Sequence, residues 1–292
     1  MTIYSRNCEL KPGIEFPDHM QRMCIGIEYN GTAFHGFQVQ KFAVDTVQGA
    51  LHEALSWVAD ESITLVCAGR TDAGVHASSQ VAHFDTLADR PLKAWSMGVN
   101  ARLPAGVSIK WAMPVVPAFH ARFSATARTY RYVIYNNPSR PAVLSKLVTW
   151  FKRPLNHDSM QSAAACLLGE HDFSAFRASQ CQANSPVRRV ESLRFAAFRD
   201  FVVIEIKANA FLHHMVRNIV GSLLAIAAGD KPVSWMKELL EGRDRRLAAA
   251  TAPGDGLYLV AVDYPAEFGI PDTPPGPDLV PEQLDWQIVG DK

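Results

Sequence analysis

The densest group of reactive side chains lies at positions 67–77, in the run CAGRTDAGVHA. Gly69 and Gly74 bracket Arg70 and Asp72, so the backbone can turn sharply and present a short polar loop. A carboxylate beside a guanidinium stays ionised near neutral pH because the positive charge favours the charged form. Asp72 is therefore a candidate nucleophile for covalent catalysis. An ordinary surface ion pair between Arg70 and Asp72 is the competing interpretation.

Oxygen and nitrogen donors near this loop raise the question of a metal site. Asp72, His76, His83 and Asp85 lie within a short span, and carboxylates and imidazoles bind divalent cations. No HxH or HExxH pattern is present, and dispersed residues of these types are more often hydrogen-bonded polar residues. The sequence therefore predicts no metal. A metal-dependent hydrolase that uses Asp72 and His76 is the alternative left open.

The elements that must position the loop follow the order β-α-β-β-α-β. An apolar run predicts a strand over 23–29, closed by the turn signal Asn30-Gly31. Apolar residues at helical spacing predict a helix capped by Thr46. The other elements predicted in this half are strands over 63–67, 80–84 and 107–115 and a helix over 92–103.

The second half repeats this order of elements. Its predicted strands cover 129–135, 147–151, 187–198, 201–209 and 257–264, and its predicted helices cover 159–168, 213–228 and 234–240. Two similar units in tandem predict an α+β fold with two ferredoxin-like halves, residues 22–118 and 119–264. Their mainly antiparallel sheets are expected to join into one catalytic body.

Both ends of the chain differ in composition from the body. Residues 1–21 are polar and without periodicity, which predicts a flexible lead-in. Residues 265–292 hold six of the 18 prolines and six acidic residues against one lysine. This composition predicts an acidic, Pro-rich tail or peripheral strap with little buried core.

Composition limits the class of protein. The chain has 292 residues, 48% of them hydrophobic, and a formal net charge of +0. Without the acidic tail, 28 basic residues face 23 acidic ones, so a polyanionic partner is compatible. Five cysteines without a CxxC pair predict reduced thiols in a cytoplasmic protein. The longest apolar stretch, 219–229, is too short for a bilayer, so no membrane association is expected.

Three further positions admit both a structural and a functional role. Arg217 falls at the border of the apolar arc of the helix over 213–228, so it can point along the core, although edge arginines commonly extend to water. Tyr130 lies in a strand, where aromatic residues mostly pack. Leu257 opens the last strand and suits the core equally well.

Basic residues interleaved with aromatic ones recur in three clusters. On a mildly basic body they fit a surface for RNA phosphates, although solvated faces explain most such charges in ordinary proteins. The clusters consist of His120, Arg122, Phe123, Arg128 and Arg131; Arg177, Arg188, Arg189 and Arg194; and Lys237, Arg243, Arg245 and Arg246.

The run GRTDAGVHA at 69–77 resembles the active-site signature of the tRNA pseudouridine synthase A family. IEYNGTAFHGFQVQ at 27–40, FHARFSATARTYRY at 119–132, FRASQCQANSPVRRV at 176–190, FLHHMVRNIVGSL at 211–223 and GLYLVAVDY at 256–264 resemble other blocks of that family in the same order. The resemblance covers residues 23–264. Phe37 departs from it, because many members have tryptophan there.

The resemblance implies an enzyme that isomerises uridine to pseudouridine in the anticodon stem-loop of tRNA, at tRNA positions 38–40. Asp72 would be the nucleophile on a flipped-out base, and Arg217 would pair with it from the other half. Tyr130 would stack on the base, Leu257 would line its pocket, and Arg70 would contact RNA. The resemblance also implies tRNA as partner, a homodimer and no cofactor.

The basic clusters supply further predicted RNA contacts, namely Arg122, Arg188 and Arg189. A non-catalytic tandem RNA-binding protein is the alternative function, because paired RNA-recognition modules share the β-α-β-β-α-β order. Such modules carry a run of the type Lys/Arg-Gly-Phe/Tyr-Gly/Ala-Phe-Val-x-Phe/Tyr. No such run is present, so the enzyme is favoured.

Overall fold

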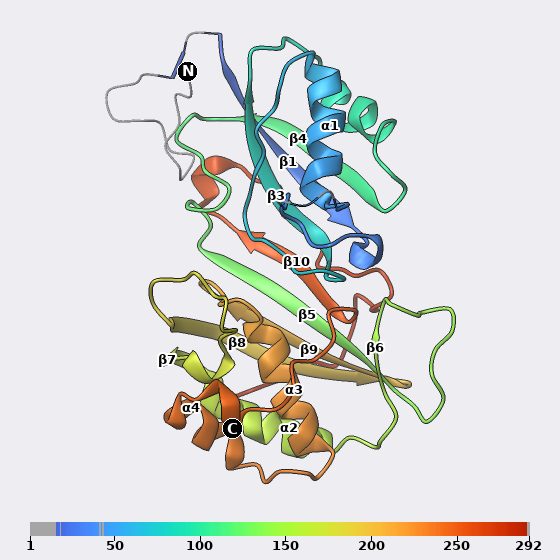
Figure 1. The fold of residues 1–292 in the computed structure, drawn as a ribbon, viewed down its shortest axis with the longest axis vertical. Helices are drawn as coiled ribbons and strands as arrows, with labels where there is room; N and C mark the ends of the chain where they lie inside the picture. The colour runs from blue at the N-terminus through green and yellow to red at the C-terminus, as the bar shows by residue number, and fades with distance from the viewer. Residues whose placement is uncertain (1–15, 18, 41, 43, 291–292) are drawn as a thin grey trace.

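The computed structural model describes residues 16–17, 19–40, 42 and 44–290 of the chain. Its central feature is one mostly antiparallel sheet in the order β11-β8-β9-β5-β10-β3-β1-β4, with few helices (Figure 1). The fold is therefore mixed α+β, and this part of the predicted class is confirmed.

The N-terminal part of the sheet has the order β4-β1-β3-β2, and its paired strands are antiparallel. The strands are β1 (Gln21–Tyr29), β2 (Val66–Cys67), β3 (His76–Thr86) and β4 (Val107–Val115). Helix α1 (Val47–Ala59) and the π-helical turn η2 (Ala94–Gly98) accompany them. The Thr46 side chain accepts a hydrogen bond from the Gly49 amide at 3.2 Å, so the expected cap starts α1.

The C-terminal part has the order β10-β5-β9-β8, again with antiparallel pairs. The strands are β5 (Ala127–Asn136), β6 (Thr149–Phe151), β7 (Gly169–Asp172), β8 (Val187–Phe198), β9 (Phe201–Ala208) and β10 (Leu257–Asp263). The helices are α2 (His157–Ala164), α3 (Met215–Ala227) and α4 (Trp235–Gly242). Short 3-10 turns are η1 (Gly31–Ala33), η3 (Ala165–Leu167), η4 (Ser174–Phe176), η5 (Arg245–Leu247) and η6 (Ala266–Phe268).

The two parts join through a short parallel pairing of β10 with β3. Tyr258 lies opposite His76 and Leu259 opposite Ala77, and the His76 and Tyr258 rings stack with centroids 4.6 Å apart. One buried apolar cluster continues across the junction. The loop that precedes β3 is thereby brought close to the elements of the C-terminal part.

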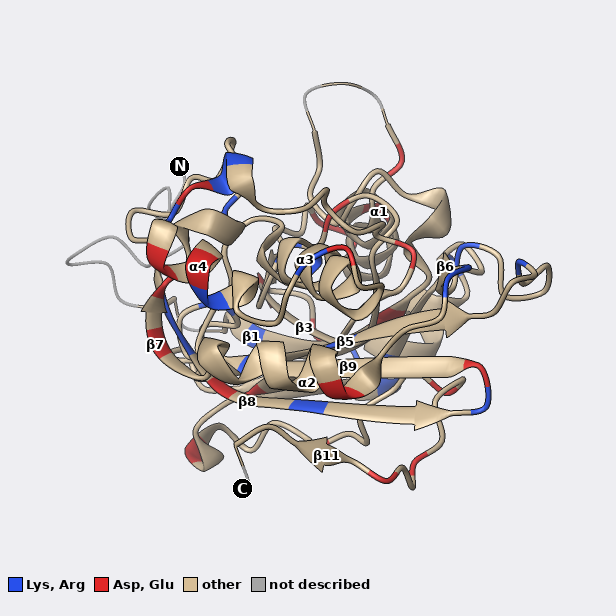
Figure 2. Cartoon of the chain, turned by 90° about the horizontal axis from the view of Figure 1, so that it is seen from below, with Lys and Arg blue, Asp and Glu red and all other residues tan. Residues whose placement is uncertain are grey.

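The C-terminal segment 265–290 crosses the face of the sheet opposite α3 and α4 (Figure 2). Its strand β11 (Gln287–Ile288) pairs with β8. Val280 and Val289 are buried, whereas composition suggested little buried core. The reason is spacing: the few apolar residues of the segment are dispersed without periodicity, and Val280 and Val289 belong to two different apolar clusters.

Beneath this segment, three charged residues on neighbouring strands form a cross-strand ladder. Glu205 on β9 accepts hydrogen bonds from Arg131 on β5 at 2.8 Å and from Arg194 on β8 at 2.6 Å. The Trp286 ring covers both guanidinium groups, 5.2 and 4.6 Å from its centroid. Arg131 also donates to the Pro275 carbonyl at 2.8 Å. The segment is therefore a packed layer of the fold.

Three further predictions can be compared with the structure. Of the predicted flexible lead-in, residues 1–15 and 18 lie outside the described residues, and β1 begins at Gln21. The four described cysteines, Cys24, Cys67, Cys166 and Cys181, are free thiols. Over the described chain, no helix has the length and apolar character required to cross a membrane.

Candidate functional site

The loop between β2 and β3 is held in place by hydrogen bonds to buried polar side chains. Gln80 donates to the Gly69 carbonyl at 2.6 Å, and the Thr71 hydroxyl lies 2.7 Å from that of Tyr29. Gly74 has a φ of 75°, a conformation in which a side chain would be strained. The sharp turn expected from the glycines is present: Asp72 is its first residue, and its carbonyl accepts a hydrogen bond from the Val75 amide at 3.2 Å.

Two other backbone segments approach this loop closely. Gly36 has a φ of 95°, and a Cβ there would lie 3.0 Å from the Thr71 carbonyl oxygen. A Cβ at Gly254 would lie 2.8 Å from the Ala73 carbonyl oxygen. Because backbone from both halves of the chain packs on the loop, the position of Asp72 is determined by the assembled fold rather than by local sequence.

The Asp72 carboxylate pairs with Arg217 of α3. Oδ2 of Asp72 lies 3.0 Å from Nη1 of Arg217, and the side chains are 24% and 16% exposed. Arg217 also donates from Nε to the Ala252 carbonyl at 2.8 Å, which fixes its guanidinium. Arg70 is exposed and forms no salt bridge with any residue described. Asp72 and Arg217 are thus brought together across 145 positions, whereas the adjacent Arg70 is left facing water.

Sequence reasoning missed two histidines that also contact the carboxylate. Nε2 of His213 lies 3.1 Å from Oδ1 of Asp72, and Nε2 of His214 lies 3.3 Å from Oδ2. Burial lowers the pKa of His214, and the neighbouring His213 and Arg217 lower it further, against the opposing effect of Asp72. The available signal was the consecutive pair of polar rings directly before an amphipathic helix.

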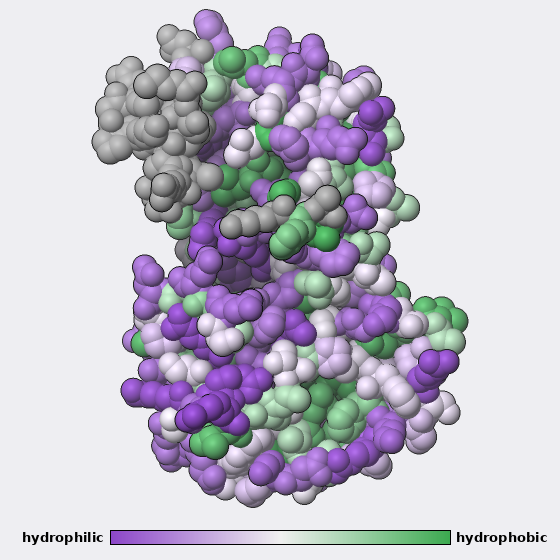
Figure 3. Space-filling view, viewed as in Figure 1, coloured by the Kyte–Doolittle hydropathy of each residue, from purple (hydrophilic) through white to green (hydrophobic). Residues whose placement is uncertain are grey.

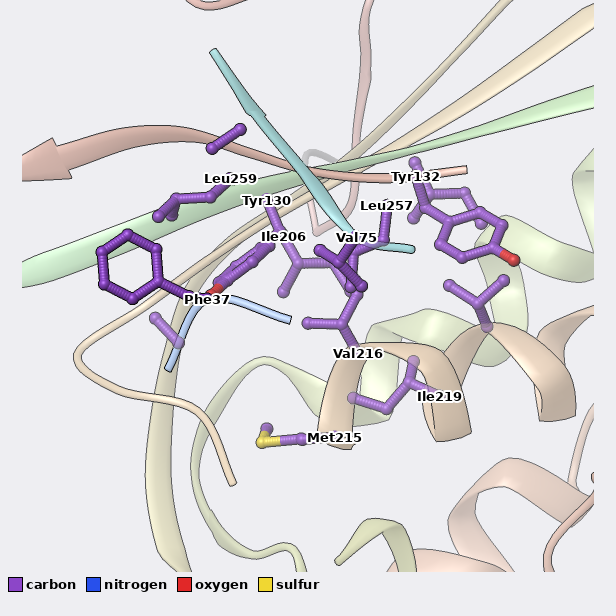
Figure 4. Packing of buried hydrophobic residues seen from close by; sticks show 14 of the residues in the cluster. Phe37, Val75, Tyr130, Tyr132, Ile206, Met215, Val216, Ile219, Leu257 and Leu259 are labelled. Carbon is purple, nitrogen blue, oxygen red and sulfur yellow. The ribbon is translucent and has the colours of Figure 1, made fainter. Parts of the chain in front are cut away.

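Tyr130 lies on the face of β5 that points toward α3. Figure 4 shows it with Phe37 and Val75 near the first turn of α3. Leu259 of β10 lies opposite Tyr130 in the sheet, and Leu257 lies opposite Tyr132. The Tyr130 ring meets Phe211 edge-on, with centroids 5.0 Å apart. Burial raises the pKa of Tyr130, and the charge of Asp72 adds to the effect, so the phenol is neutral. The arrangement offers an aromatic surface beside the carboxylate.

The residues first considered as metal ligands have other partners. Nδ1 of His76 accepts from the Gly31 amide at 3.0 Å, Nδ1 of His83 accepts from the Ala121 amide at 3.1 Å, and Asp85 pairs with Arg22 at 2.8 Å. They do not converge with Asp72.

One described group brings three donor atoms together, those of Asp72, His213 and His214, which lie within 4.8 Å of one another. The Arg217 guanidinium on the same carboxylate supplies the positive charge that a metal ion would bring. The group is therefore interpreted as a hydrogen-bonded carboxylate.

The buried histidines are expected to make stability depend on pH. Burial lowers the pKa of His76, and burial with the charge of Arg22 lowers that of His83 well below 6.5. Below pH 6.5 these histidines therefore bind protons in the unfolded chain but stay neutral in the folded chain. The free energy of unfolding should decrease as the pH is lowered, by up to about 1.4 kcal/mol per pH unit for each histidine. Urea unfolding at pH 7.5, 6.5 and 5.5 measures the slope. His83→Gln should reduce it, exposed His157→Gln should not, and a flat wild-type profile would refute the assignment.

The basic residues fall into an internal and an external set. Arg128 and Arg131 are buried and Arg245 is half-buried. Arg128 donates to the Ala68 carbonyl at 3.0 Å, and Arg245 donates to the Ala249 carbonyl at 2.9 Å. The remaining members of the third cluster each have a carboxylate partner within the described chain. Arg128 and Arg131 are buried, so these two members of the first cluster cannot belong to a surface for RNA; contact of RNA with the exposed members stays a prediction.

The external set differs in exposure. Arg122 and Arg189 are exposed, whereas Arg188 is half-buried and donates to the Ser185 carbonyl at 3.0 Å. Burial lowers the pKa of Arg188.

Figure 3 shows the molecule hollowed at its waist, between the upper and lower halves, with hydrophilic side chains in the hollow.

Comparison with known proteins gives consistent matches. A model of the tRNA pseudouridine synthase family matches residues 25–124 and 163–265. The chain is 57% identical to tRNA pseudouridine synthase A of Klebsiella pneumoniae subsp. pneumoniae over 256 residues, 88% of this chain and 94% of that protein. It is 55% identical to the Pseudomonas aeruginosa protein of the same name over 261 residues, 89% and 92% of the two chains.

A solved structure of an H/ACA ribonucleoprotein bound to a substrate RNA containing 2′-deoxyuridine aligns with a TM-score of 0.37 and 10% identity. The alignment covers 77% of this chain and 52% of that one. Such a TM-score supports no inference about this chain.

Proposed function

The chain belongs to the tRNA pseudouridine synthase family, which isomerises uridine in tRNA, and we propose that its target lies in the anticodon stem-loop and that Asp72 is the nucleophile. The observation that carries the proposal is the Asp72 carboxylate at the junction of the two halves, paired with Arg217 at 3.0 Å. The guanidinium favours the ionised form of the carboxylate, which nucleophilic attack requires.

The reaction conserves every atom of the nucleotide. The C1′–N1 bond breaks, and its electron pair leaves with the uracil ring. C5 of the same ring then bonds to C1′, a proton leaves C5, and N1 gains a proton. A carboxylate oxygen of Asp72 is proposed to bond to C1′ as the C1′–N1 bond breaks, and this C1′–O bond breaks in turn when C5 bonds to C1′, which regenerates the carboxylate. No electron is gained or lost overall, so the proposed mechanism needs no redox cofactor, and the ionised Asp72 is proposed to make a Lewis-acid metal unnecessary.

Tyr130 is proposed to stack on the extruded uracil, with Leu257 at the edge of its pocket. The support is the neutral phenol beside Asp72 and its apolar surroundings, which suit a base removed from the helical stack. Because burial keeps the Tyr130 proton in place, stacking fits this residue better than the role of a general base.

The RNA-binding surface is proposed to use exposed arginines around the site. Arg70 adjoins Asp72 in the loop, and Arg122 lies over the exposed Phe123 ring with its guanidinium carbon 5.5 Å from the centroid. Arg189 is exposed on β8. Arg188 keeps a smaller part in this proposal, since it is half-buried and bonded to backbone. Such residues would contact phosphates and leave sequence reading to few positions.

The salt dependence of tRNA binding tests this surface. Each phosphate contact that is lost should make the plot of log affinity against log salt less steep by about 0.7–0.9. We expect the double variant Arg122→Ala/Arg189→Ala to show a shallower slope and weaker binding. Arg246→Ala is the matched control, because Arg246 is exposed but already paired with Asp244. Equal slopes for the double variant and the wild type would remove these arginines from the surface.

The finer architecture is also part of the proposal. We infer two tandem ferredoxin-like halves, which the strand orders β4-β1-β3-β2 and β10-β5-β9-β8 support. A cytoplasmic homodimer is proposed in addition. Free cysteines suit a reducing compartment, and pairing two mildly basic bodies would enlarge the surface that attracts tRNA. Light scattering of the purified protein would give the number of copies directly.

Release of tritium from C5 tests the proposed activity. A tRNA transcript made with uridine labelled with tritium at C5 should lose label to water when incubated with the protein, because forming C1′–C5 expels the hydrogen of C5. The result expected is release in proportion to the target uridines of the transcript. Absence of release from every anticodon-arm transcript tested would refute the proposed function.

A further inference from the structure

Two adjacent histidines surround the carboxylate that Arg217 holds. The His213 and His214 rings lie side by side, with centroids 4.1 Å apart. His214 has a φ of 62°, in the left-handed region, which non-glycine residues adopt only where the surroundings impose it. This backbone turn lets two consecutive side chains reach one carboxylate, which an extended backbone would point to opposite sides.

The backbone on both sides of the turn is fixed. The His213 carbonyl accepts from the Ala178 amide at 3.0 Å, and the His214 carbonyl accepts from the Asn218 amide at 2.9 Å within the first turn of α3. The two rings are therefore held by the loop over 176–184 on one side and by the helix on the other. Their contact with Asp72 is part of this arrangement.

The distribution of donors over the two carboxylate oxygens is unequal. Oδ2 lies within 3.3 Å of both Arg217 and His214, whereas Oδ1 has His213 alone among the described residues. A carboxylate oxygen has about two lone-pair directions. Of these contacts, that of Arg217 Nη1 with Oδ2 has hydrogen-bond geometry, so Oδ2 is the more strongly held oxygen and Oδ1 is the one with room for a reacting carbon.

We propose that His213 and His214 are positioning residues, which donate from Nε2 to opposite oxygens of Asp72, stop its rotation and leave Oδ1 as the attacking atom. An ionised carboxylate can only accept, so each Nε2 must carry the proton. Cys181 lies against the His213 amide, and Arg217 and Arg245 add positive charge near His214. The inference rests on the proposed role of Asp72 as nucleophile.

The test compares two replacements of His213. His213→Phe keeps a ring of similar size without a donor, whereas His213→Gln keeps an amide donor near the position of Nε2. We expect the single-turnover rate of His213→Phe to fall by about 10- to 100-fold, since small errors of alignment cost that much. His213→Gln should recover most of the loss, and tRNA affinity should stay within about 3-fold for both, because phosphates supply most of it. His157→Gln, on the exposed start of α2, is the control.

A second measurement, by NMR, does not depend on catalytic activity. Nitrogen-15 NMR of the imidazoles should show the Nε2-protonated tautomer for both residues in the wild type, and Asp72→Ala should change both signals. The proposal is overturned if His213→Phe reacts at the wild-type rate, or if the tautomer is Nδ1-protonated. If His213→Phe does not fold, the tautomer in the wild type and the single-turnover rate of His213→Gln decide whether the proposal holds. An inactive wild type would refute the proposed function instead, and the NMR result would still decide the geometry.

Discussion

Replacing Asp72 with asparagine is expected to abolish turnover while the protein still folds and binds tRNA. A carboxamide keeps the shape of the side chain but is not a useful nucleophile, and loss of a catalytic nucleophile lowers kcat by about 10⁴-fold or more. Affinity should change little, because phosphate contacts lie elsewhere. The pair with Arg217 is partly exposed, so its loss should cost about 1–3 kcal/mol of folding free energy.

Asp255→Asn is the matched control for this variant. Asp255 is also a partly exposed carboxylate, 28% exposed and 3.3 Å from Lys146, and it lies next to the same loop, since a Cβ at Gly74 would be 3.4 Å from its Oδ1. Turnover, tRNA affinity and Tm should be measured on one preparation of each. Joint loss of folding and binding in Asp72→Asn would mark Asp72 as a structural residue.

The second large effect concerns the C-terminal segment. Deleting residues 271–292 is expected to lower the free energy of unfolding by about 4 kcal/mol, because each of the buried Val280 and Val289 contributes roughly 1.5–3 kcal/mol. For a domain of this size that corresponds to a fall in Tm of about 10 °C. The deletion also uncovers the apolar cluster around Val133, Val203 and Val260, so the shortened protein should aggregate readily.

Single replacements separate packing from chain length in that segment. Val280→Ala and Trp286→Ala should each lower Tm, since one is buried in the cluster and the other covers Arg131 and Arg194. Ile288→Ala is the control, because its side chain is 50% exposed in β11. A deletion variant with unchanged Tm and turnover would show that the segment is dispensable.

Elements with strong local signals were predicted well from the sequence. The alternation over 187–198 gave β8 with its observed bounds, and the Thr46 cap marked the start of α1. Short strands were missed, because β7 and β11 each depend on β8 as a distant partner rather than on their own pattern. Strand β2 is shorter than predicted: Ile63 and Leu65 are buried yet lie outside the hydrogen-bonded ladder.

The site was only partly predictable, because it too depends on contacts between residues that are distant in the sequence. Asp72 could be selected from its glycine-bracketed loop, and helical periodicity placed Arg217 at the edge of the core. Their meeting depends on the pairing of β3 with β10, which no local pattern encodes. The arginine clusters misled, because sequence spacing does not distinguish exposed Arg122 from Arg131, which a buried glutamate and a later segment cover. His213 and His214 were read as the start of a helix.

Mapping pseudouridine at nucleotide resolution shows whether the protein modifies the anticodon stem-loop and whether it needs Asp72 to do so. Unmodified tRNA transcripts are incubated with the wild type, with Asp72→Asn and with Asp255→Asn. The conversion of uridine to pseudouridine is then determined at every uridine position. Pseudouridine is expected at uridines of the anticodon stem-loop with the wild type and with Asp255→Asn, and at none with Asp72→Asn. Modification confined to another arm of the tRNA, or equal modification by Asp72→Asn, would contradict it.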